Sequence, residues 1–187
     1  MSKRVCPWWL GYLLASPLRR LMVNPRKLLA PYVHEGMTVL EPGPGMGFFT
    51  LELARLVGAP GRVVALDIQS KMLDGLKRRL AKAGLQERVN ILLVQPDTMR
   101  LDDLAGSVDF ALAFAVVHEM PSASSFFAEL SRALKPGGSI LFAEPVGHVK
   151  AALWDAELEA ASQAGFIVVK RPSIRRSHTA LLKKEMA

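Results

Sequence analysis

The chain has 187 residues, of which 50% are hydrophobic and 22% are charged, a balance typical of a compact globular protein. This length predicts one domain, 1–187, in which residues 1–36 form a helical lid or substrate segment and residues 37–187 form the core. The only cysteine, Cys6, excludes an internal disulfide and a cysteine-rich metal site, and it favours a reducing compartment. No apolar run approaches the roughly 20 residues that cross a bilayer, so we expect a cytoplasmic protein.

Basic residues outnumber acidic ones by 24 to 17, which gives a net charge of +7. Such a charge admits an acidic partner, RNA or an anionic membrane surface, and it suits a basic cytosolic protein without one equally well. Much of the positive charge lies towards the two ends, at Lys3, Arg4, Arg19, Arg20, Arg26, Lys27, Arg171, Arg175 and Arg176. RNA binding and peripheral membrane contact therefore stay open as alternatives.

Two helical patterns, 7–21 and 25–32, precede a region in which short apolar runs alternate with longer runs of helical period. The short runs predict strands at Thr38–Glu41, Arg62–Asp67, Val89–Val94, Val108–Phe114 and Ser139–Ala143. The helical runs between them are 48–57, 70–83 and 123–134. Gly58 and Gly84 follow two of these helices, where a C-terminal cap is expected. The alternation predicts an α/β fold, a parallel sheet with helices on both faces.

The end of the chain breaks this alternation. A strong turn signal, Lys135-Pro136-Gly137-Gly138, comes before the fifth strand. After that strand we expect a helix over 149–164, ended by Gly165, and then strands near 166–170 and 178–183. The connection between the last two strands is too short for a crossover helix, so this pair should be antiparallel.

A glycine-rich turn follows the first predicted strand. The strand runs into Glu41, and glycines follow at positions 43, 45 and 47. Closely spaced glycines let the backbone approach a ligand that a Cβ atom would block. The dinucleotide fingerprint is G-x-G-x-x-G, whereas the spacing here is G-x-G-x-G with a carboxylate two residues before it. That carboxylate would repel a pyrophosphate and suits a ligand that carries an ammonium group.

Two further carboxylates end or follow strands of the same predicted sheet. Asp67 ends the second strand, about twenty residues after the glycine turn, where an acidic side chain can accept both ribose hydroxyls. Asp97 follows the third strand and could accept from the exocyclic amine of an adenine. Ile68 and Met72 could form apolar walls for that base. Each Asp could instead be only a helix cap, but three carboxylates in this order favour a nucleoside site.

These motifs resemble the successive motifs of class I S-adenosylmethionine-dependent methyltransferases. The resemblance rests on Glu41-Pro42-Gly43-Pro44-Gly45-Met46-Gly47, Val64-Ala65-Leu66-Asp67, Pro96-Asp97-Thr98 and Leu134-Lys135-Pro136-Gly137-Gly138, and it spans about 31–183. Within the class, the chain looks most similar to the small-molecule branch of the ubiquinone and menaquinone biosynthesis methyltransferases. The family implies a Rossmann-like seven-stranded sheet in the order 3-2-1-4-5-7-6, with the seventh strand antiparallel.

The resemblance also implies a cofactor, S-adenosylmethionine, with S-adenosylhomocysteine as the product. In the family, the glycine turn holds the methionine part, an acidic residue like Glu41 faces its ammonium, Asp67 takes the ribose, and Asp97 with Thr98 takes the adenine. The full set of expected cofactor-binding residues is Glu41, Gly43, Pro44, Gly45, Gly47, Asp67, Ile68, Met72, Pro96, Asp97, Thr98 and Ala115.

Polar side chains follow the fourth and fifth strands, which are neighbours in the implied sheet. His118 and Glu119 come after the fourth strand, and Glu144 and His148 come at and after the end of the fifth. Two of the four histidines of the chain therefore fall here, and we expect these four residues to be catalytic. His118 is the candidate base or substrate orienter, and the glutamates could orient the histidine rings. The ligand types would also permit a metal, but the spacing is irregular and we expect none.

The acceptor is less well defined by the sequence. The family's N-methyltransferases of DNA or RNA bases carry Asn/Asp-Pro-Pro-Tyr/Phe after the fourth strand, whereas this chain has Phe114-Ala115-Val116-Val117. This departure argues against the exocyclic amines of DNA or RNA bases as acceptors, though not against other positions of RNA, and we expect no DNA partner. The predicted reaction is methyl transfer by in-line displacement to a small, partly apolar molecule. An RNA methyltransferase and a non-catalytic S-adenosylmethionine-binding protein are the alternatives. The apolar helix of Trp8–Leu14 could be a lid, could simply pack on the sheet edge, or could lie in a membrane surface.

Overall fold

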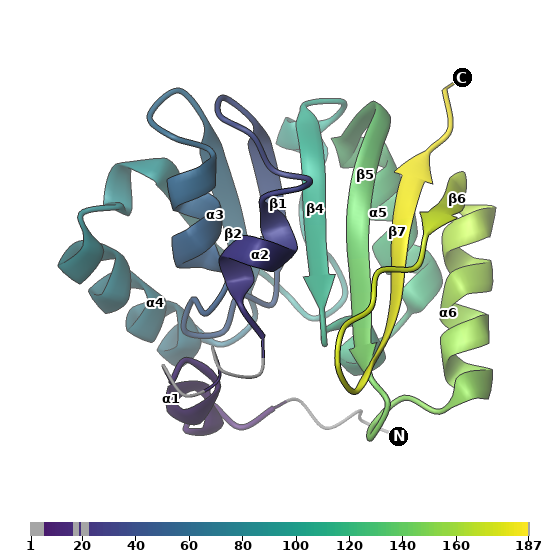
Figure 1. The fold of residues 1–187 in the computed structure, drawn as a ribbon, viewed down its shortest axis with the longest axis horizontal. Coiled ribbons are helices and arrows are strands. Elements are labelled where there is room, and N and C mark those ends of the chain that lie inside the picture. The colour runs from purple at the N-terminus through teal and green to yellow at the C-terminus, as the bar shows by residue number, and fades with distance from the viewer. Residues whose placement is uncertain (1–5, 17–18, 20–22, 187) are drawn as a thin grey trace. The chain divides into compact units, whose positions relative to one another are not determined.

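The structure, a computed structural model, describes residues 6–16, 19 and 23–186. Of the basic residues singled out in the sequence, Lys3, Arg4 and Arg20 lie outside the described residues. The fold divides into two compact units, an N-terminal unit, Val5–Val94, and a C-terminal unit, Gln95–Ala187. Each unit is a piece of sheet with its own helices (Figure 1).

The N-terminal unit contains three parallel strands, β1 (Thr38–Pro42), β2 (Arg62–Asp67) and β3 (Val89–Leu93). Val39, Val63 and Leu40 of these strands are fully buried, as expected of parallel strands whose side chains form the core. The helices of this unit are α1 (Leu10–Leu14), α2 (Pro25–Leu29), α3 (Thr50–Leu56) and α4 (Ser70–Ala83), with a 3-10 turn, η2, at Gln86–Arg88.

Local sequence signals explain where several of these helices begin and end. Asn24 caps α2, because its side chain accepts a hydrogen bond from the Lys27 amide, and Pro25 occupies the first helical position. Gly84 caps the C-terminus of α4 in the left-handed conformation, as its position in the sequence predicted. Gly58, with φ of +66°, follows α3 in the same way.

The described helices of this unit differ in length from the predicted ones. Within residues 6–16, the helical pattern over 7–21 forms the five-residue α1, and residues 17, 18, 20 and 21 of that range lie outside the described residues. The pattern over 25–32 forms α2, which ends at Leu29. The helix expected from Phe48 begins at Thr50, because the chain is still turning through residues 45–49. There Phe48 and Phe49 pack edge to face, with ring centroids 4.9 Å apart.

The C-terminal unit contains β4 (Val108–Phe114), β5 (Leu134–Pro145), β6 (Phe166–Lys170) and β7 (Ser177–Lys184). β4 and β5 are parallel. β7 is antiparallel to β6, as the short final connection predicted, and it is also antiparallel to β5. The helices are α5 (Ala123–Ala133) and α6 (Ala151–Gln163), and the 3-10 turns are η3 (Asp102–Leu104) and η4 (Val117–Glu119).

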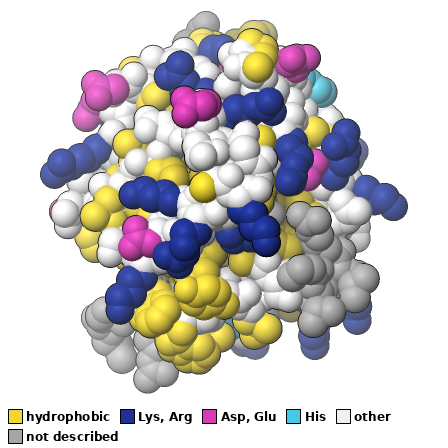
Figure 2. Space-filling model, turned by 90° about the vertical axis from the view of Figure 1, so that its left-hand side faces the viewer, with side chains coloured by type: hydrophobic (Ala, Val, Ile, Leu, Met, Phe, Trp, Pro, Cys, Tyr) yellow, Lys and Arg dark blue, Asp and Glu magenta, His cyan; other side chains and the backbone are white. Residues whose placement is uncertain are grey.

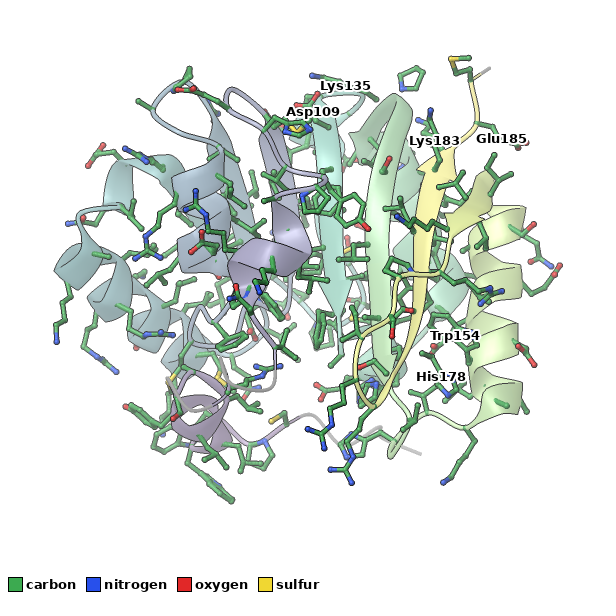
Figure 3. The ribbon with its side chains drawn as sticks, in the orientation of Figure 1. Asp109, Lys135, Trp154, His178, Lys183 and Glu185 are labelled. Carbon is green, nitrogen blue, oxygen red and sulfur yellow. The ribbon has the colours of Figure 1, made fainter. Side chains whose placement is uncertain are left out.

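Strand β5 starts earlier than the sequence indicated. The Lys135–Gly138 turn lies within its bounds, and the register with β4 jumps there, from Val108 opposite Leu134 to Phe110 opposite Ser139. The turn therefore loops out of the ladder instead of preceding the strand, and Gly137 takes a positive φ of +73°. Lys135 Nζ lies 2.5 Å from Asp109 Oδ1 beside this loop (Figure 3).

Aromatic side chains fill the core of the C-terminal unit. Phe127 and Phe142 are fully buried and meet edge to face, with centroids 5.4 Å apart. Phe142 also stacks on Trp154 of α6, and Trp154 stacks in turn on His178 of β7, with centroids 4.6 and 5.4 Å apart (Figure 3). His178 Nε2 lies 3.1 Å from the Val149 carbonyl oxygen, so this histidine helps to fix the start of α6.

Backbone pairing orders the seven strands β3-β2-β1-β4-β5-β7-β6. The predicted Rossmann-like order 3-2-1-4-5-7-6 with an antiparallel seventh strand is therefore confirmed. In the part of the chain that the structure describes, no helix is long and apolar enough to span a membrane.

Candidate active site

The three glycines after β1 have three different structural roles. All take positive φ, which glycine adopts without the steric cost of a Cβ atom. The Gly43 amide donates to the Leu66 carbonyl of β2, which fixes the start of the turn. A Cβ at Gly47 would lie 2.5 Å from Leu76 Cδ1, so this glycine allows close helix packing. A Cβ at Gly45 would meet nothing described within 4 Å, so Gly45 lines open space that a ligand could occupy.

Glu41, just before this turn, is a buried carboxylate with an unsatisfied oxygen. Its side chain is 3% exposed, and Oε2 has no hydrogen-bond partner among the described residues. Burial raises the pKa of Glu41 to about 7, the Thr50 hydroxyl opposes this shift, and the charge of Asp67 adds to it. A buried carboxylate oxygen without a partner costs free energy unless a cation or donor arrives. The site therefore fits a ligand that brings an ammonium group.

Asp67 lies at the end of β2 in the same unit and is buried, with 9% of its surface exposed. Its Oδ1 accepts a 2.9 Å hydrogen bond from the Gln69 amide, which shapes the turn into α4. Met72, one turn into α4, is buried, and Ile68 is half-buried. The N-terminal unit thus brings together Glu41, Asp67 and the glycine turn, and the charge of Asp67 acts on Glu41. A carboxylate and two apolar side chains at one strand end suit a ribose and an adenine.

The Asp97 segment opens the C-terminal unit as a tight turn. Pro96 and Asp97 are exposed, and the Thr98 amide donates to the Gln95 carbonyl across the turn. The Thr98 hydroxyl lies 3.4 Å from Glu129 Oε2 and accepts from the Arg100 amide. Thr98 therefore shapes the turn, and Asp97 carries the accessible carboxylate.

The strongest polar constellation in the C-terminal unit joins His118 to Glu144. Glu144 is fully buried, and its Oε1 accepts hydrogen bonds from the amides of Val117 and His118, at 2.7 and 3.3 Å. Its Oε2 lies 2.5 Å from His118 Nδ1. An ionised carboxylate can only accept, so Nδ1 carries the proton and the neutral ring presents the lone pair of Nε2. His118 is thus held in the tautomer that a general base needs.

The surroundings of His118 raise its pKa. Burial alone would lower it, but the hydrogen bond and charge of Glu144, together with the charges of Glu119 and Glu157, outweigh burial and raise the pKa above its ordinary value of 6.5. Glu119 Oε1 lies 3.9 Å from Nε2. The exposed ring of His148 lies beside His118, with centroids 5.6 Å apart. All four predicted catalytic residues therefore gather in one cluster of this unit.

Ala115 shows that the loop after β4 is strained. It has φ of +56°, a conformation that costs a residue with a Cβ roughly 1–2 kcal/mol. Its amide donates to the Ala143 carbonyl of β5 over 2.8 Å, which holds the loop against the neighbouring strand. This sharp turn delivers the Val117 and His118 amides to Glu144.

Two buried carboxylates that support the site were missed by the sequence reasoning. Glu129 of α5 accepts from the Met99 amide at 3.0 Å, and Glu157 of α6 is 2% exposed and acts on His118 through its charge. Both lie on the apolar stripes of their helices, Glu129 between Phe126 and Leu130. A carboxylate on a buried helical stripe is the signal that could have found them. In the described residues, no group of three or more His, Cys, Asp and Glu side chains could hold a metal ion.

Strand order, the G-x-G-x-G turn, the strand-end carboxylates and the unsatisfied oxygen of Glu41 together define a class I S-adenosylmethionine-dependent methyltransferase. Residues 39–138 match the sequence profile of the methyltransferase domain family, and the chain belongs to this family. Its cofactor is S-adenosylmethionine. The predictions of family and cofactor are confirmed.

Two relatives of similar sequence are both named as methyltransferases. The chain is 32% identical over 111 residues to a demethylmenaquinone methyltransferase from Lactococcus lactis, a match that covers 58% of this chain and 42% of that protein. It is 29% identical over 127 residues to the ubiquinone/menaquinone biosynthesis C-methyltransferase UbiE of a Marinomonas species, which covers 66% and 49%. The chain therefore matches less than half the length of these two relatives.

One solved structure is similar over nearly the whole fold. A SAM-dependent methyltransferase from Aquifex aeolicus superposes with a TM-score of 0.84 and 26% identity, covering 96% of this chain and 98% of that one. The likeness therefore includes the C-terminal strands that lie beyond the family match at residue 138.

Proposed function

We propose that this protein transfers a methyl group from S-adenosylmethionine to a small, partly apolar molecule that must lose a proton to react. The observation that carries the proposal is the buried Glu41 carboxylate, whose Oε2 has no partner among the described residues, at the end of a strand that leads into the open space at Gly45. The cofactor supplies a methyl group on a positively charged sulfur, a strong electrophile.

The N-terminal unit would contact three parts of the cofactor, the methionine part, the ribose and the faces of the base. Glu41 would pair with the ammonium of the methionine part, and Gly45 would leave room for its chain. Asp67 would accept the ribose hydroxyls, with Ile68 and Met72 as apolar walls for the base. In the C-terminal unit, the exposed carboxylate of Asp97 would accept from the adenine amine.

His118 would take the proton that the acceptor loses. Its Nε2 lone pair is the free acceptor of the ring, since Nδ1 donates to Glu144. Glu144 would stabilise the resulting imidazolium, and its own position is fixed by two backbone amides. Because the base form of His118 exists only above its pKa, turnover should fall as the pH drops through a value above 6.5.

An apolar acceptor is favoured by the residues beside His118. Val116 and Val117 are buried, and the amine-binding Asn/Asp-Pro-Pro motif is absent from this part of the sequence. Relatives named as demethylmenaquinone and ubiquinone/menaquinone methyltransferases act, as their names say, in quinone chemistry, so a hydroxylated aromatic ring with an apolar tail is the acceptor we propose. A proton on a ring hydroxyl also gives His118 a task.

Two assays test this proposal. Calorimetry should show binding of S-adenosylhomocysteine and none of NAD, and Asp67→Ala should abolish that binding while its thermal unfolding stays cooperative. Tritium from labelled S-adenosylmethionine should then appear in a quinol fraction of a lipid extract. Transfer to RNA instead would favour the RNA alternative, and cofactor binding with no transfer to any fraction would favour a non-catalytic binding protein. Binding of NAD would contradict the cofactor assignment.

A further inference from the structure

The N-terminal unit exposes a patch of large apolar side chains on and just before α1. Their exposed fractions are 38% for Trp8, 59% for Trp9, 57% for Tyr12, 66% for Leu13 and 41% for Leu14. Figure 2 shows hydrophobic side chains gathered at the foot of this face, at the level of α1 in Figure 1, with Lys and Arg side chains above them. Contiguous apolar patches of this kind mark an interaction surface on a globular protein.

The segment that carries this patch is held in place. Gly11 is buried in α1, and a Cβ there would come within 2.7 Å of Met72 Sδ, so the helix packs directly on α4. Gln69 Nε2 donates to the Cys6 carbonyl at 2.9 Å, before the helix. After it, Arg19 Nη1 donates to the Leu14 carbonyl at 3.0 Å. The Arg19 guanidinium also lies over the Phe48 ring, 4.4 Å from its centre. These contacts hold α1 and its flanking residues against the rest of the N-terminal unit, and the apolar side chains of the patch stay exposed.

Basic side chains border the patch directly. Lys71 Nζ lies 4.6 Å from the centre of the Trp8 ring, and Arg78 Nη2 lies 3.3 Å from the Tyr12 hydroxyl. Both belong to α4, which carries one acidic residue, Asp74, and the five basic residues Lys71, Lys77, Arg78, Arg79 and Lys82.

A hollow of about 350 Å³ opens beside the patch, lined among others by Tyr12, Ser16, Arg78 and Arg79. Arg79 Nη1 donates to the Met46 carbonyl at 2.6 Å, so one of its two arginines is fixed by the glycine turn. The two arginines in this lining favour an anionic group such as a phosphate. The hollow and the patch thus favour a ligand that is anionic at one end and apolar beyond it.

We propose that this face docks on an anionic phospholipid bilayer. Trp8, Trp9 and Leu13 enter the boundary between headgroups and acyl chains, where amphipathic aromatic rings are favoured. Lys71 and Arg78 face the anionic headgroups, and the hollow receives one lipid phosphate. Tryptophan and tyrosine on and just before α1, bordered by lysine and arginine of α4, match the two requirements of interfacial binding, apolar area and positive charge.

The docking does not rest on the proposed acceptor, since binding to lipid can be measured without turnover. Co-sedimentation of the full chain with vesicles should show binding to phosphatidylcholine mixed with phosphatidylglycerol, and weak or no binding to phosphatidylcholine alone. Added salt should weaken the binding to mixed vesicles. The double variant Trp9→Ser with Leu13→Ser should bind at least about tenfold more weakly, because it loses inserted apolar area. Lys71→Gln and Arg78→Gln should each weaken binding about fivefold.

A matched control comes from the other unit. Ile167 and Val169 of β6 are each 47% exposed, so Ile167→Ser with Val169→Ser removes exposed apolar side chains from a strand of the C-terminal unit and leaves α1 unchanged. This variant should bind vesicles like the unaltered protein. All variants concern exposed side chains and should keep their thermal midpoint and their affinity for S-adenosylhomocysteine.

Several results would overturn the docking. These are no binding of the unaltered protein to anionic vesicles, equal binding by the Trp9 and Leu13 variant, and an equal loss in the β6 control. Vesicle binding that depends on neither the anionic lipid content nor the salt concentration would overturn the role of the basic residues. If the protein binds vesicles but transfers no methyl group to the quinol fraction, this result contradicts the proposed acceptor and does not contradict the docking.

Discussion

Glu41 and Glu144 are both glutamates followed by proline at the end of a parallel strand, yet their carboxylates differ in their hydrogen-bond partners. Glu144 is fully buried and has a partner for each oxygen, two backbone amides on Oε1 and His118 on Oε2. Glu41 is 3% exposed, and its Oε2 has no partner among the described residues.

The difference lies in what surrounds each buried carboxylate: Glu144 contacts His118, whereas the unpaired oxygen of Glu41 is the one that we propose binds an ammonium group. Burial raises the pKa of Glu41 to about 7 because nothing compensates fully for lost hydration. The hydrogen-bond donors around Glu144 offset the free-energy cost of burying its carboxylate. Variants of the two sites should therefore separate chemistry from cofactor binding.

The largest effect should come from His118→Ala, which removes the base that Glu144 holds. We expect turnover to fall by about 10²–10⁴-fold. The affinity for S-adenosylhomocysteine should be unchanged, because His118 belongs to the C-terminal cluster and not to the Glu41 site. Initial rates with saturating cofactor, together with calorimetry, measure the two quantities. A variant that loses cofactor binding as well would show that His118 acts on the cofactor.

Glu144→Gln should have nearly as large an effect through the tautomer of His118. The amide oxygen must stay on the Val117 N–H, so the amide NH₂ faces His118 Nδ1 and makes it an acceptor. The proton then moves to Nε2, where the ring can no longer serve as a base, and turnover should fall about 10²-fold or more. Nitrogen NMR of His118 should report the changed tautomer and a lowered pKa. An unchanged tautomer with full activity would contradict the assignment.

Glu41→Gln should stabilise the free protein while it weakens the cofactor complex. The pKa of Glu41 is higher in the folded than in the unfolded chain, so its contribution to stability is complete below pH 4.5 and is lost as the pH rises through about 7. At pH 8 the neutral amide avoids this cost, and the free energy of unfolding should rise by about 1–3 kcal/mol. Urea unfolding at pH 5 and pH 8 tests the prediction. If the substitution changes the free energy of unfolding equally at the two pH values, ionisation of Glu41 does not destabilise the folded protein.

In the glycine turn, two alanine substitutions form a matched pair, of which Gly45→Ala should have the smallest effect on stability. Both positions have positive φ, but only Gly47→Ala also brings a Cβ within 2.5 Å of Leu76. Gly47→Ala should lower the unfolding free energy by about 2–3 kcal/mol, and Gly45→Ala by about 1 kcal/mol, with a loss of cofactor affinity that exceeds its loss of stability. Chemical unfolding and calorimetry separate the two. The reverse order would show that Gly45 is the packing glycine.

Much of the fold could be predicted because local patterns determine it. The alternation of apolar runs with helical segments predicted the parallel sheet, the resemblance implied the strand order, and Gly84 ended α4 as its position indicated. The extent of the N-terminal helix was not predictable, because α1 depends on Gly11 fitting closely against Met72, a contact between distant parts of the sequence.

The site was predictable in its residue types but not in its contacts. Position at a strand end predicted a role for both glutamates, but not which of them would be paired. The pairing of Glu144 depends on the left-handed conformation of Ala115, which no local signal announces at a residue with a Cβ. The role of Thr98 at the adenine stays a prediction, and no local pattern indicated that its hydroxyl contacts Glu129 and accepts from the Arg100 amide.

The most direct measurement is the affinity for S-adenosylhomocysteine as a function of pH, in the unaltered protein and in Glu41→Gln. If the carboxylate receives an ammonium, binding must first remove the Glu41 proton below pH 7, so the Kd should rise about tenfold between pH 8 and pH 6. The Glu41→Gln protein should bind more weakly at pH 8 and show no such dependence. Equal and pH-independent affinities in the two proteins would contradict the role given to Glu41.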